Sequence, residues 1–388
     1  MVLCGLFCYD EFVYTGGFML YREYGRTGKK VSILGFGGMR FADIKNHDEC
    51  VRSMVIAAEG GVNYFDTAPG YFETKSEIVF GKGFAELKRK KLPFFCATKT
   101  TASTESAIRR EIEAQLKRLG LNTIDFYHIW CITSLDNWKS RKKDGVLLTF
   151  QKLKEEGLIR HICVSSHLIN DEIKELLMEG VFEGVLFGYS AYNFQSRQAA
   201  FDAVREKKLG AVVMNPLGGG LIPEHPELFK FLQGHGEKPG KTIVSAALRF
   251  LWDHPEISVT LVGCDTVSHT VEALEAIEGY KPRTEKELAA VKAGAKASLE
   301  GICTGCAYCV SGKTGSACPQ GIPIPKFMDA YNQKILAGPG ERDPIGDRLR
   351  WHWSLNNSVA GKCIACGNCE KTCTQHINII ERLREVAG

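Results

Sequence analysis

The stretch ESAIRREIEAQLKRLGLNTIDFYHIW, Glu105–Trp130, contains one complete unit of the pattern that decides the fold. Its first part has apolar residues at three- and four-residue intervals and stops at Gly120, which predicts an amphipathic helix. IDFYHIW is rich in aromatic and β-branched residues and predicts a buried strand. A helix followed directly by a strand is the repeating unit of an α/β protein.

The same alternation extends from residue 31 to about residue 280. Eight segments predict strands: VSILGFG, VNYFD, FFCATK, IDFYHIW, HICVSS, GVLFGYS, AVVMNP and VTLVG. Eight strands that alternate with helices favour a closed (β/α)₈ barrel over an open sheet, and no GxGxxG follows the first strand as in a Rossmann fold. The segment LYREYGRTGKKVSIL, before the first strand ends, predicts a hairpin that closes the bottom of the barrel.

The 388 residues exceed one typical domain, and a cysteine-rich segment without strand patterns follows the alternation. We expect a poorly ordered extension at 1–18, the barrel at 19–295 and a small, mainly helical domain at 296–388. The first segment lacks the basic region of a signal peptide, and no apolar run approaches the ~20 residues of a membrane span. A net charge of +4 is too small to indicate a nucleic-acid or membrane partner, so we expect neither.

Eight of the 15 cysteines form two clusters near the C-terminus. CTGCAYC is separated by eight residues from a further Cys-Pro, and CIACGNC by three residues from a further cysteine. The spacing C-x₂-C-x₂-C-x₃-C-P is typical of proteins with two iron–sulfur clusters, in which the fourth cysteine binds the other cluster. We therefore expect two [4Fe–4S] clusters, as in ferredoxins. The expected ligands are Cys303, Cys306, Cys309 and Cys373 for one cluster, and Cys363, Cys366, Cys369 and Cys318 for the other.

Zinc is the alternative metal, because CxxC pairs also bind Zn²⁺. Structural zinc sites rarely use a third cysteine at the same spacing, so two triplets favour iron–sulfur clusters. Ligand cysteines must stay reduced, which predicts a cytoplasmic protein. The clusters would exchange single electrons with a ferredoxin or flavoprotein carrier, or they would only hold the tail against the barrel.

The predicted strand ends of the barrel bring together an acid, a phenol and an ammonium. Barrels of this kind place their catalytic residues at the C-terminal ends of the strands, where Asp66, Tyr71 and Lys99 stand in this sequence. A tyrosine has a pKa of about 10, which is too high for an acid at neutral pH, and a neighbouring ammonium lowers that pKa. Each residue alone is more often structural, but the combination predicts a proton-donating site.

The barrel resembles the aldo-keto reductase family over roughly residues 19–280, through GVNYFDTAPGY, ATKT, GLIRHICVSSH, NPLGGG and VGCDTVSHTVEAL. With its tail, the chain resembles a subgroup that carries a C-terminal two-cluster 4Fe-4S ferredoxin-like domain. The resemblance implies a TIM barrel enzyme, an oxidoreductase that interconverts a small carbonyl compound and an alcohol with a nicotinamide cofactor. Tyr71 would donate the proton, and Lys99 and Asp66 would tune its pKa.

By the same resemblance, three segments would bind the nicotinamide cofactor. The expected residues are Ser165 and Ser166 at the carboxamide, Pro216, Leu217 and Gly218 along the pyrophosphate, and Gly263 and Asp265 at the adenosine end. A phosphate site after the seventh and eighth strands also agrees with the physics of such barrels. The last segment offers no Lys or Arg for a 2′-phosphate, which favours NAD(H) over NADP(H).

Three positions depart from the family pattern. The family's catalytic histidine aligns with Trp130. His128, the candidate for a fourth catalytic residue, faces the same side of the strand but about 6.5 Å deeper. The glutamine expected on the sixth strand is replaced by Leu186, and the aromatic residue that would stack on nicotinamide by Met214. These losses leave a second hypothesis, a non-catalytic electron-transfer or assembly subunit with a degenerate reductase barrel.

Overall fold

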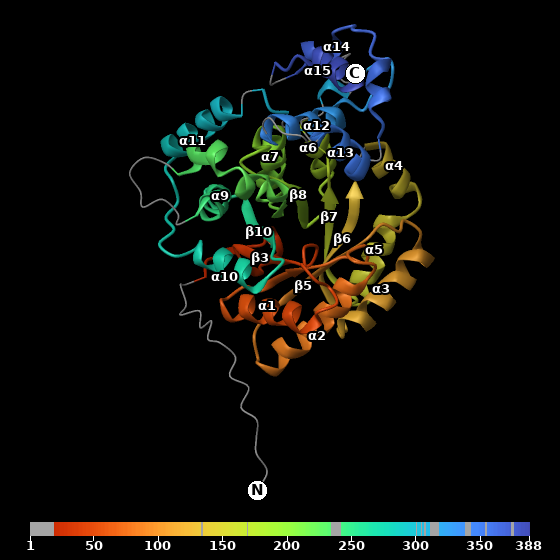
Figure 1. The fold of residues 1–388 in the computed structure, drawn as a ribbon. Helices are drawn as coiled ribbons and strands as arrows, with labels where there is room; N and C mark the ends of the chain where they lie inside the picture. The colour runs from red at the N-terminus through yellow and green to blue at the C-terminus, as the bar shows by residue number, and fades with distance from the viewer. Residues whose placement is uncertain are drawn as a thin grey trace.

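The structure, a computed structural model, describes residues 19–132, 135–168, 170–233, 242–299, 301–303, 305, 308–310, 318–337, 343–353, 355–373 and 376–388. The extension expected at 1–18 and the expected ligand Cys306 lie outside these residues. The cysteine-rich part lies over one end of a barrel, the end toward which β6 points (Figure 1). No helix among the described residues combines the length and the apolar character needed to cross a membrane.

Eight parallel strands close into a barrel in the order β10-β3-β4-β5-β6-β7-β8-β9, which confirms the predicted (β/α)₈ fold. The strands are β3 Leu34–Gly37, β4 Tyr64–Asp66, β5 Phe95–Thr100, β6 Ile124–Ile132, β7 Ile159–Ser166, β8 Gly184–Gly188, β9 Gly210–Met214 and β10 Ile257–Gly263. Each of them overlaps one of the eight predicted segments. The antiparallel hairpin before them consists of β1 Tyr21–Glu23 and β2 Lys30–Ser32.

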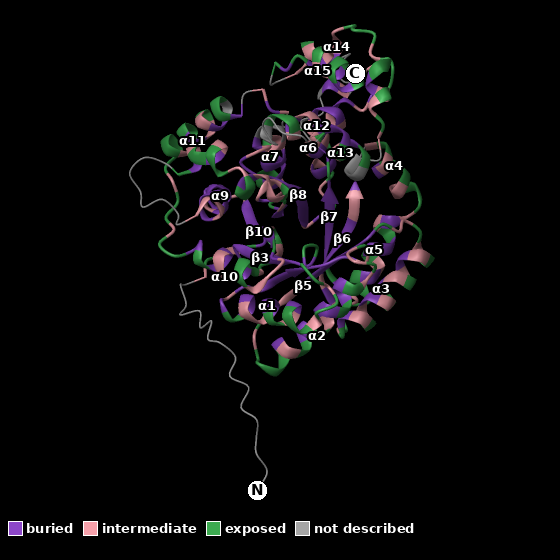
Figure 2. Cartoon of the chain, in the orientation of Figure 1, coloured by how far each residue is buried: buried purple, intermediate pink, exposed green. Residues whose placement is uncertain are grey.

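Helices cover the outside of the barrel, with their exposed faces turned to solvent and the strands buried behind them (Figure 2). They are α1 His47–Glu59, α2 Lys75–Arg89, α3 Glu105–Leu119, α4 Leu135–Lys143, α5 Val146–Glu155, α6 Asn170–Met178, α7 Gln198–Lys207, α8 Leu221–Glu224, α9 Ile243–Trp252 and α10 Val267–Glu275. Short 3₁₀ helices are η1 Gly25–Thr27, η2 Phe194–Arg197, η3 Gly218–Gly220 and η4 Pro226–Leu232. Helix α3 buries Ile108 and Ile112 and ends at Gly120 in the left-handed conformation, as its sequence predicts.

The hairpin closes the bottom of the barrel through the ring of Tyr24, which is fully buried. Its ring centroid lies 4.2 Å from that of Phe126 and 6.1 Å from that of Tyr64. Two glycines of β8 and β9 make room for it, because a Cβ atom at Gly184 or Gly210 would lie 2.2 Å from Tyr24. The hairpin predicted from the sequence therefore acts as a plug.

The cysteine-rich part is mainly helical, as predicted, and its described residues include no strand. Helix α11 Glu285–Ser298 precedes it and packs on the barrel core through Val291 and Ala295. The elements of the cysteine-rich part are η5 Tyr308–Val310, α12 Ile324–Ala337, α13 Pro344–Asp347, the π-helical η6 Arg348–Trp353, η7 Asn357–Lys362, α14 Asn368–Lys371 and α15 Ile379–Ala387. Phe327, Met328 and Leu383 form its small core together with the buried Cys309 and Cys369. Cysteine side chains therefore contribute to the hydrophobic core of this part, which is too small to bury many apolar residues.

A buried hydrogen-bonded group joins this part to the barrel. Tyr192, in the loop after β8, donates from its hydroxyl to the carbonyl oxygen of Cys303 over 2.5 Å. It accepts a hydrogen bond of 2.8 Å from the side-chain amide of Asn332 on α12. Asn332 also donates to the Cys303 carbonyl and accepts from the Cys303 amide nitrogen. These contacts fix Cys303 at the C-terminal rim of the barrel.

We expect Tyr192→Phe to loosen this attachment, because it leaves the Asn332 amide and the Cys303 carbonyl each one partner short. An unsatisfied buried polar group costs about 1–3 kcal/mol. Hydrogen exchange should show faster exchange of the Cys303 amide and unchanged exchange along β6. Tyr21→Phe, which removes an exposed hydroxyl bonded to Gly61, is the matched control. Equal protection of Cys303 in both variants would show that the contact contributes nothing.

Candidate functional site

A buried ion pair lies at the C-terminal ends of β4 and β5. Lys99 Nζ is 2.5 Å from Asp66 Oδ1 and donates a second hydrogen bond, of 2.7 Å, to the Thr67 carbonyl. The two side chains are 0% and 1% exposed. Burial raises the pKa of Asp66. Burial also acts to lower the pKa of Lys99, but Asp66 and Tyr71 together outweigh it, so that the Lys99 pKa is raised. The rise for Lys99 is that of an ammonium held by a carboxylate, whereas the rise for Asp66 reflects its burial, which the charge of Lys99 opposes.

Tyr71 lies beside this pair. The Lys99 ammonium is 5.1 Å from the centroid of the tyrosine ring. Burial raises the pKa of Tyr71, and the charge of Lys99 opposes that rise. The ring also meets the ring of Trp130 edge to face, with 5.8 Å between the centroids. Gly70 leaves room for this contact, since a Cβ atom there would lie 2.7 Å from the indole.

His128 lies below this group, inside the barrel. It stands next to Lys99 in the register of β5 and β6 and is fully buried. Its Nε2 atom is 3.5 Å from the hydroxyl of Tyr64, which packs against the plug. Burial and the charge of Lys99 lower the pKa of His128 to about 3, so the imidazole is neutral. The structure therefore brings Trp130, rather than His128, into contact with the Tyr71 ring.

The two serines expected at the nicotinamide carboxamide stand at the end of β7. Ser165 is buried, and its hydroxyl has no hydrogen-bond partner among the described residues. Ser166 accepts a hydrogen bond of 3.1 Å from the backbone amide of Leu168. A buried hydroxyl without a partner at a strand end fits a ligand with amide hydrogen-bonding groups.

The segments expected at the pyrophosphate and adenosine follow β9 and β10 on the same rim. Pro216 is buried and Leu217 half-buried, and Gly218 opens a run of three glycines with positive φ. Such a run lets backbone amides approach a phosphate closely. Gly263 ends β10, and the Asp265 side chain is hydrogen-bonded to that of His269. The residues present thus fit a dinucleotide laid from β7 to β10.

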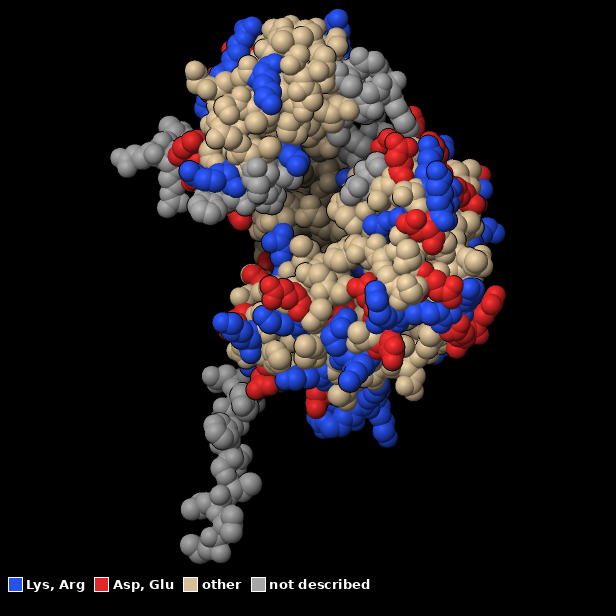
Figure 3. All heavy atoms as spheres, turned by 90° about the vertical axis from the view of Figure 1, so that its right-hand side faces the viewer, with Lys and Arg blue, Asp and Glu red and all other residues tan. Residues whose placement is uncertain are grey.

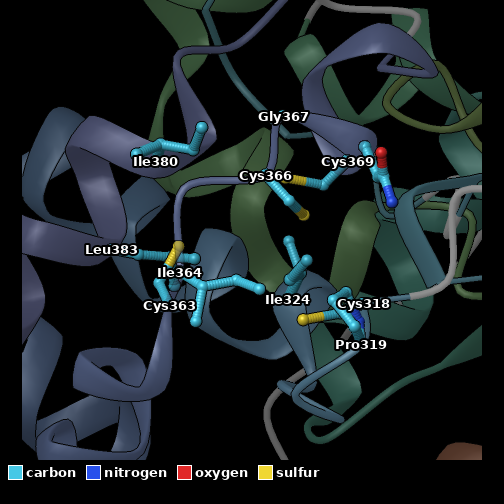
Figure 4. Close-up of a pocket in the computed structure, with 11 residues that line it drawn as sticks. Cys318, Pro319, Ile324, Cys363, Ile364, Cys366, Gly367, Cys369, Ile380 and Leu383 are labelled. Atoms are coloured by element: carbon cyan, nitrogen blue, oxygen red, sulfur yellow. The ribbon is translucent and has the colours of Figure 1, made fainter.

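Four cysteines line one cavity in the C-terminal part (Figure 4). They are Cys318, Cys363, Cys366 and Cys369, the four residues that the spacing assigns to one cluster. The cavity has about 320 Å³ of free space, including its opening to solvent, and its apolar lining comprises Pro319, Ile324, Ile364, Ile380 and Leu383. Cys303, Cys309 and Cys373 of the other expected set pack on the same core.

The spacing of the thiols around this cavity bears on the choice between zinc and iron–sulfur. Among the described residues, no three His, Cys, Asp or Glu side chains surround a position for a single metal ion. In a [4Fe–4S] cluster each thiolate binds a different iron, so the four ligands stand apart around a larger body. Four cysteine side chains around one apolar cavity therefore fit the ligand set of a [4Fe–4S] cluster.

Some residues of the site have no signal in the sequence. Tyr192 and Asn332 are ordinary loop and helix residues that meet only because the two parts of the chain lie against each other. Arg197 follows β8 without a motif and bonds backbone carbonyls after β7. Arg141, on α4, donates to the carbonyl of Trp130 over 2.7 Å.

Comparison with known proteins agrees with this geometry. Residues 33–295 match the model of the aldo/keto reductase family, and residues 302–378 match that of the 4Fe-4S dicluster domain. The chain is 30% identical over 284 residues to L-galactose dehydrogenase of Arabidopsis thaliana, covering 66% of this chain and 87% of that protein. It is 26% identical over 198 residues to the NADH-specific methylglyoxal reductase of Escherichia coli, covering 45% and 58%.

Among solved structures, the fold is similar to that of aldo-keto reductase AKR11C1 from Bacillus halodurans in its holo form, with a TM-score of 0.62. The two share 24% sequence identity, and the match covers 72% of this chain and 97% of that one. The family model spans most of the barrel, and a 4Fe-4S domain follows it, as the sequence resemblance implied. The chain belongs to the aldo/keto reductase family and is an oxidoreductase whose barrel is followed by a 4Fe-4S iron–sulfur domain.

Proposed function

We propose that the protein interconverts a small carbonyl compound and an alcohol at Tyr71, with a nicotinamide cofactor, and that two [4Fe–4S] clusters link this reaction to one-electron carriers. The observation that carries the proposal is the buried pair of Lys99 and Asp66 beside Tyr71. Relatives that are named a dehydrogenase and a reductase support a reaction of this type. The intact set of three residues argues against a degenerate, non-catalytic barrel.

In the reductive direction the hydroxyl of Tyr71 gives its proton to the carbonyl oxygen of the substrate. Burial raises the pKa of Tyr71 and so opposes the phenolate, and the Lys99 ammonium stabilises it. Asp66 keeps that ammonium charged and in place. Positioned general acid catalysis of this kind contributes roughly 10²–10⁴-fold to the rate. A bound nicotinamide supplies the hydride, or accepts it in the reverse reaction.

The residues that would hold the nicotinamide cofactor are those at the ends of β7, β9 and β10. Ser165 and Ser166 would bind the carboxamide, the segment Pro216–Gly218 the pyrophosphate, and Gly263 with Asp265 the adenosine. An acidic side chain at this last position would repel a 2′-phosphate, which supports NAD(H). The printed name of the Escherichia coli relative, an NADH-specific reductase, agrees with that choice.

Trp130 would form an apolar wall of the substrate site, where the family resemblance places a histidine. Its ring contacts Tyr71, whereas His128 is buried near Tyr64. With His128 neutral and below the site, Tyr71 alone would polarise the carbonyl oxygen. Simple aldehydes would then be poor substrates, and good ones would bring a polar group of their own.

The clusters would use the two sets of cysteines expected from the spacing. One set, Cys318 with Cys363, Cys366 and Cys369, supports a cluster by lining a common cavity. The other set is Cys303, Cys306, Cys309 and Cys373. Hydride carries two electrons and a cluster exchanges one, so a flavoprotein would have to divide the pair, and a ferredoxin would accept single electrons. Such ligands require a reducing compartment, which favours a cytoplasmic location.

We expect Tyr71→Phe to lower kcat for carbonyl reduction by at least about 10²-fold while the Kd for NADH changes less than twofold. The substitution removes the proton and leaves the binding surface. Steady-state kinetics and fluorescence titration with NADH measure the two quantities. Tyr21→Phe, at the opposite end of the barrel, serves as the control. Activity within threefold of wild type would place the proton donor elsewhere.

The pH profile tests the role of His128. Its pKa is lowered to about 3, so the imidazole is already neutral above that value and does not titrate between pH 5 and 8. We expect no inflection near pH 6.5 in kcat/KM that depends on this residue. His128→Gln, which keeps a hydrogen-bonding group near Tyr64, should have a profile of the same shape. An inflection that the variant loses would make His128 an acid or base of the reaction.

Metal analysis tests the clusters. Protein purified without oxygen should contain about eight irons and eight sulfides per chain, and Cys318→Ser should lose up to half of them. Electron paramagnetic resonance should then show the signal of one reduced cluster. Cys264→Ser, which changes a buried cysteine of the barrel, is the control. Stoichiometric zinc without iron–sulfur absorbance would refute the assignment.

A further inference from the structure

Two arginines at the mouth of the barrel carry charges that no acidic side chain among the described residues neutralises. Arg197 stands at the end of η2, in the loop after β8, and Arg141 stands on α4, after β6. Neither forms an ion pair with an acid among the described residues. A desolvated cation without a counter-ion is unfavourable, which indicates that a ligand supplies the negative charge.

Arg197 is the more deeply desolvated of the two. Its Nη1 atom donates to the carbonyl oxygens of His167, over 3.2 Å, and of Leu168. Its Nε atom is buried and has no hydrogen-bond partner among the described residues. Burial lowers the pKa of Arg197 to about 10, so the guanidinium still carries its charge at neutral pH. Among the described residues, Arg197 therefore has no counter-charge, and its Nε donor has no acceptor.

The inner face of β8 shows where this guanidinium lies. Gly184 and Leu186 face the barrel interior, because a Cβ atom at Gly184 would meet Tyr24 and Leu186 packs in the same cluster. Side chains alternate along a strand, so Gly188 faces the interior as well. The atom nearest to a Cβ placed at Gly188 is Nη2 of Arg197, at 4.0 Å. The guanidinium thus reaches the inner side of the mouth, where β8 has no side chain.

Arg141 stands on α4, which follows β6, and β7 separates β6 from β8 in the barrel. It donates to the backbone carbonyl of Trp130, whose ring touches Tyr71. Burial lowers the pKa of Arg141 too. Two other cations of α4, Lys139 and Lys142, are paired with acids at 3.6 and 2.7 Å. Unlike these two lysines, Arg141 has a backbone acceptor and no acidic partner among the described residues.

The surroundings favour a substrate over the cofactor as the source of the negative charge. Figure 3 shows a hollow between the barrel and the C-terminal part, with walls that consist mainly of uncharged residues. The cofactor phosphates are assigned above to the loops after β9 and β10, whereas the two arginines follow β6 and β8. In a water-poor hollow a cation attracts an anion more strongly than it does in bulk water.

On the basis of the function proposed above, we propose that Arg197 and Arg141 bind an anionic group of the substrate, a carboxylate or a phosphate ester, while the substrate's carbonyl lies at Tyr71. The planar donors of arginine match the oxygens of both groups. The substrate class is then a short carbonyl or hydroxy compound with an oxyanion at its far end. Such a substrate brings the polar contact that the Trp130 wall does not offer.

The test compares substrates that differ only in charge. Succinic semialdehyde is paired with butanal, and glyceraldehyde 3-phosphate with glyceraldehyde, using the anaerobically purified protein with NADH. We expect kcat/KM of the wild type to be at least tenfold higher for the charged member of one pair than for its neutral member. The pair that shows this difference tells whether the anionic group of the substrate is a carboxylate or a phosphate. Arg197→Met should reduce this charged-to-neutral ratio by about 10- to 100-fold, because charge-assisted hydrogen bonds are lost.

Two further variants serve as controls. Arg197→Lys keeps the charge and loses the planar donors, so it should retain part of the ratio and shows that the site is folded. Arg110→Met removes an exposed arginine on α3 and should leave the ratio of wild type unchanged. Equal kcat/KM for both members of both pairs in wild type, or an unchanged ratio in Arg197→Met, would overturn the proposal.

Equilibrium binding separates this proposal from the function on which it rests. Tyr71→Phe loaded with NADH should bind succinate or inorganic phosphate in calorimetry although it does not turn over, and Tyr71→Phe combined with Arg197→Met should bind at least tenfold more weakly. If the wild type binds the anion but reduces no aldehyde, the proposed anion site is supported and the proposed carbonyl reduction is refuted. If the protein reduces neutral aldehydes and binds neither anion, the reaction stands and the anion site is wrong.

Discussion

A charged lysine and a charged aspartate can be buried inside a barrel only if each compensates the charge of the other. Removing one partner of such a pair typically costs about 3–5 kcal/mol, whereas apolar residues in the same place would be at least as stable. The pair of Lys99 and Asp66 therefore adds little to the free energy of unfolding. Its effect is to keep a positive charge fixed beside Tyr71. It depends on the register of β4 and β5, in which Asp66 lies opposite Ala97, two residues before Lys99. A slip of one residue would turn the lysine out of the barrel.

Because the position of the ion pair depends on strand register, much of the site can be predicted from the sequence. Strand alternation and helical periodicity are local, so the eight strands, the plug and the strand-end positions of Asp66 and Lys99 can be predicted without the structure. The spacing of the cysteines is local as well. It also predicts that Cys318 joins the second triplet, and these four residues line one cavity.

What the sequence does not show depends on contacts between loops. Alternation places His128 and Trp130 on the same side of β6 at different depths, but the edge-to-face contact of Trp130 with Tyr71 depends on a loop after β4 that the pattern does not describe. Arg197 has no periodic neighbour that would indicate its direction, and it reaches the mouth because Gly188 leaves the inner face of β8 empty. Loops carry specificity, and their geometry is set by the scaffold rather than by their own pattern.

The loop after β8 connects the two kinds of chemistry in this chain. Tyr192 in this loop holds the backbone of Cys303, an expected cluster ligand, and Arg197 at its end reaches the mouth of the barrel. One short segment, anchored at the rigid end of β8, therefore has a contact with the iron–sulfur domain on one side and with the proposed substrate anion on the other. The backbone of Cys303 is hydrogen-bonded to Tyr192, five residues before Arg197 in the same loop. The iron–sulfur domain is thus in direct contact with the loop that carries the arginine proposed to bind the substrate.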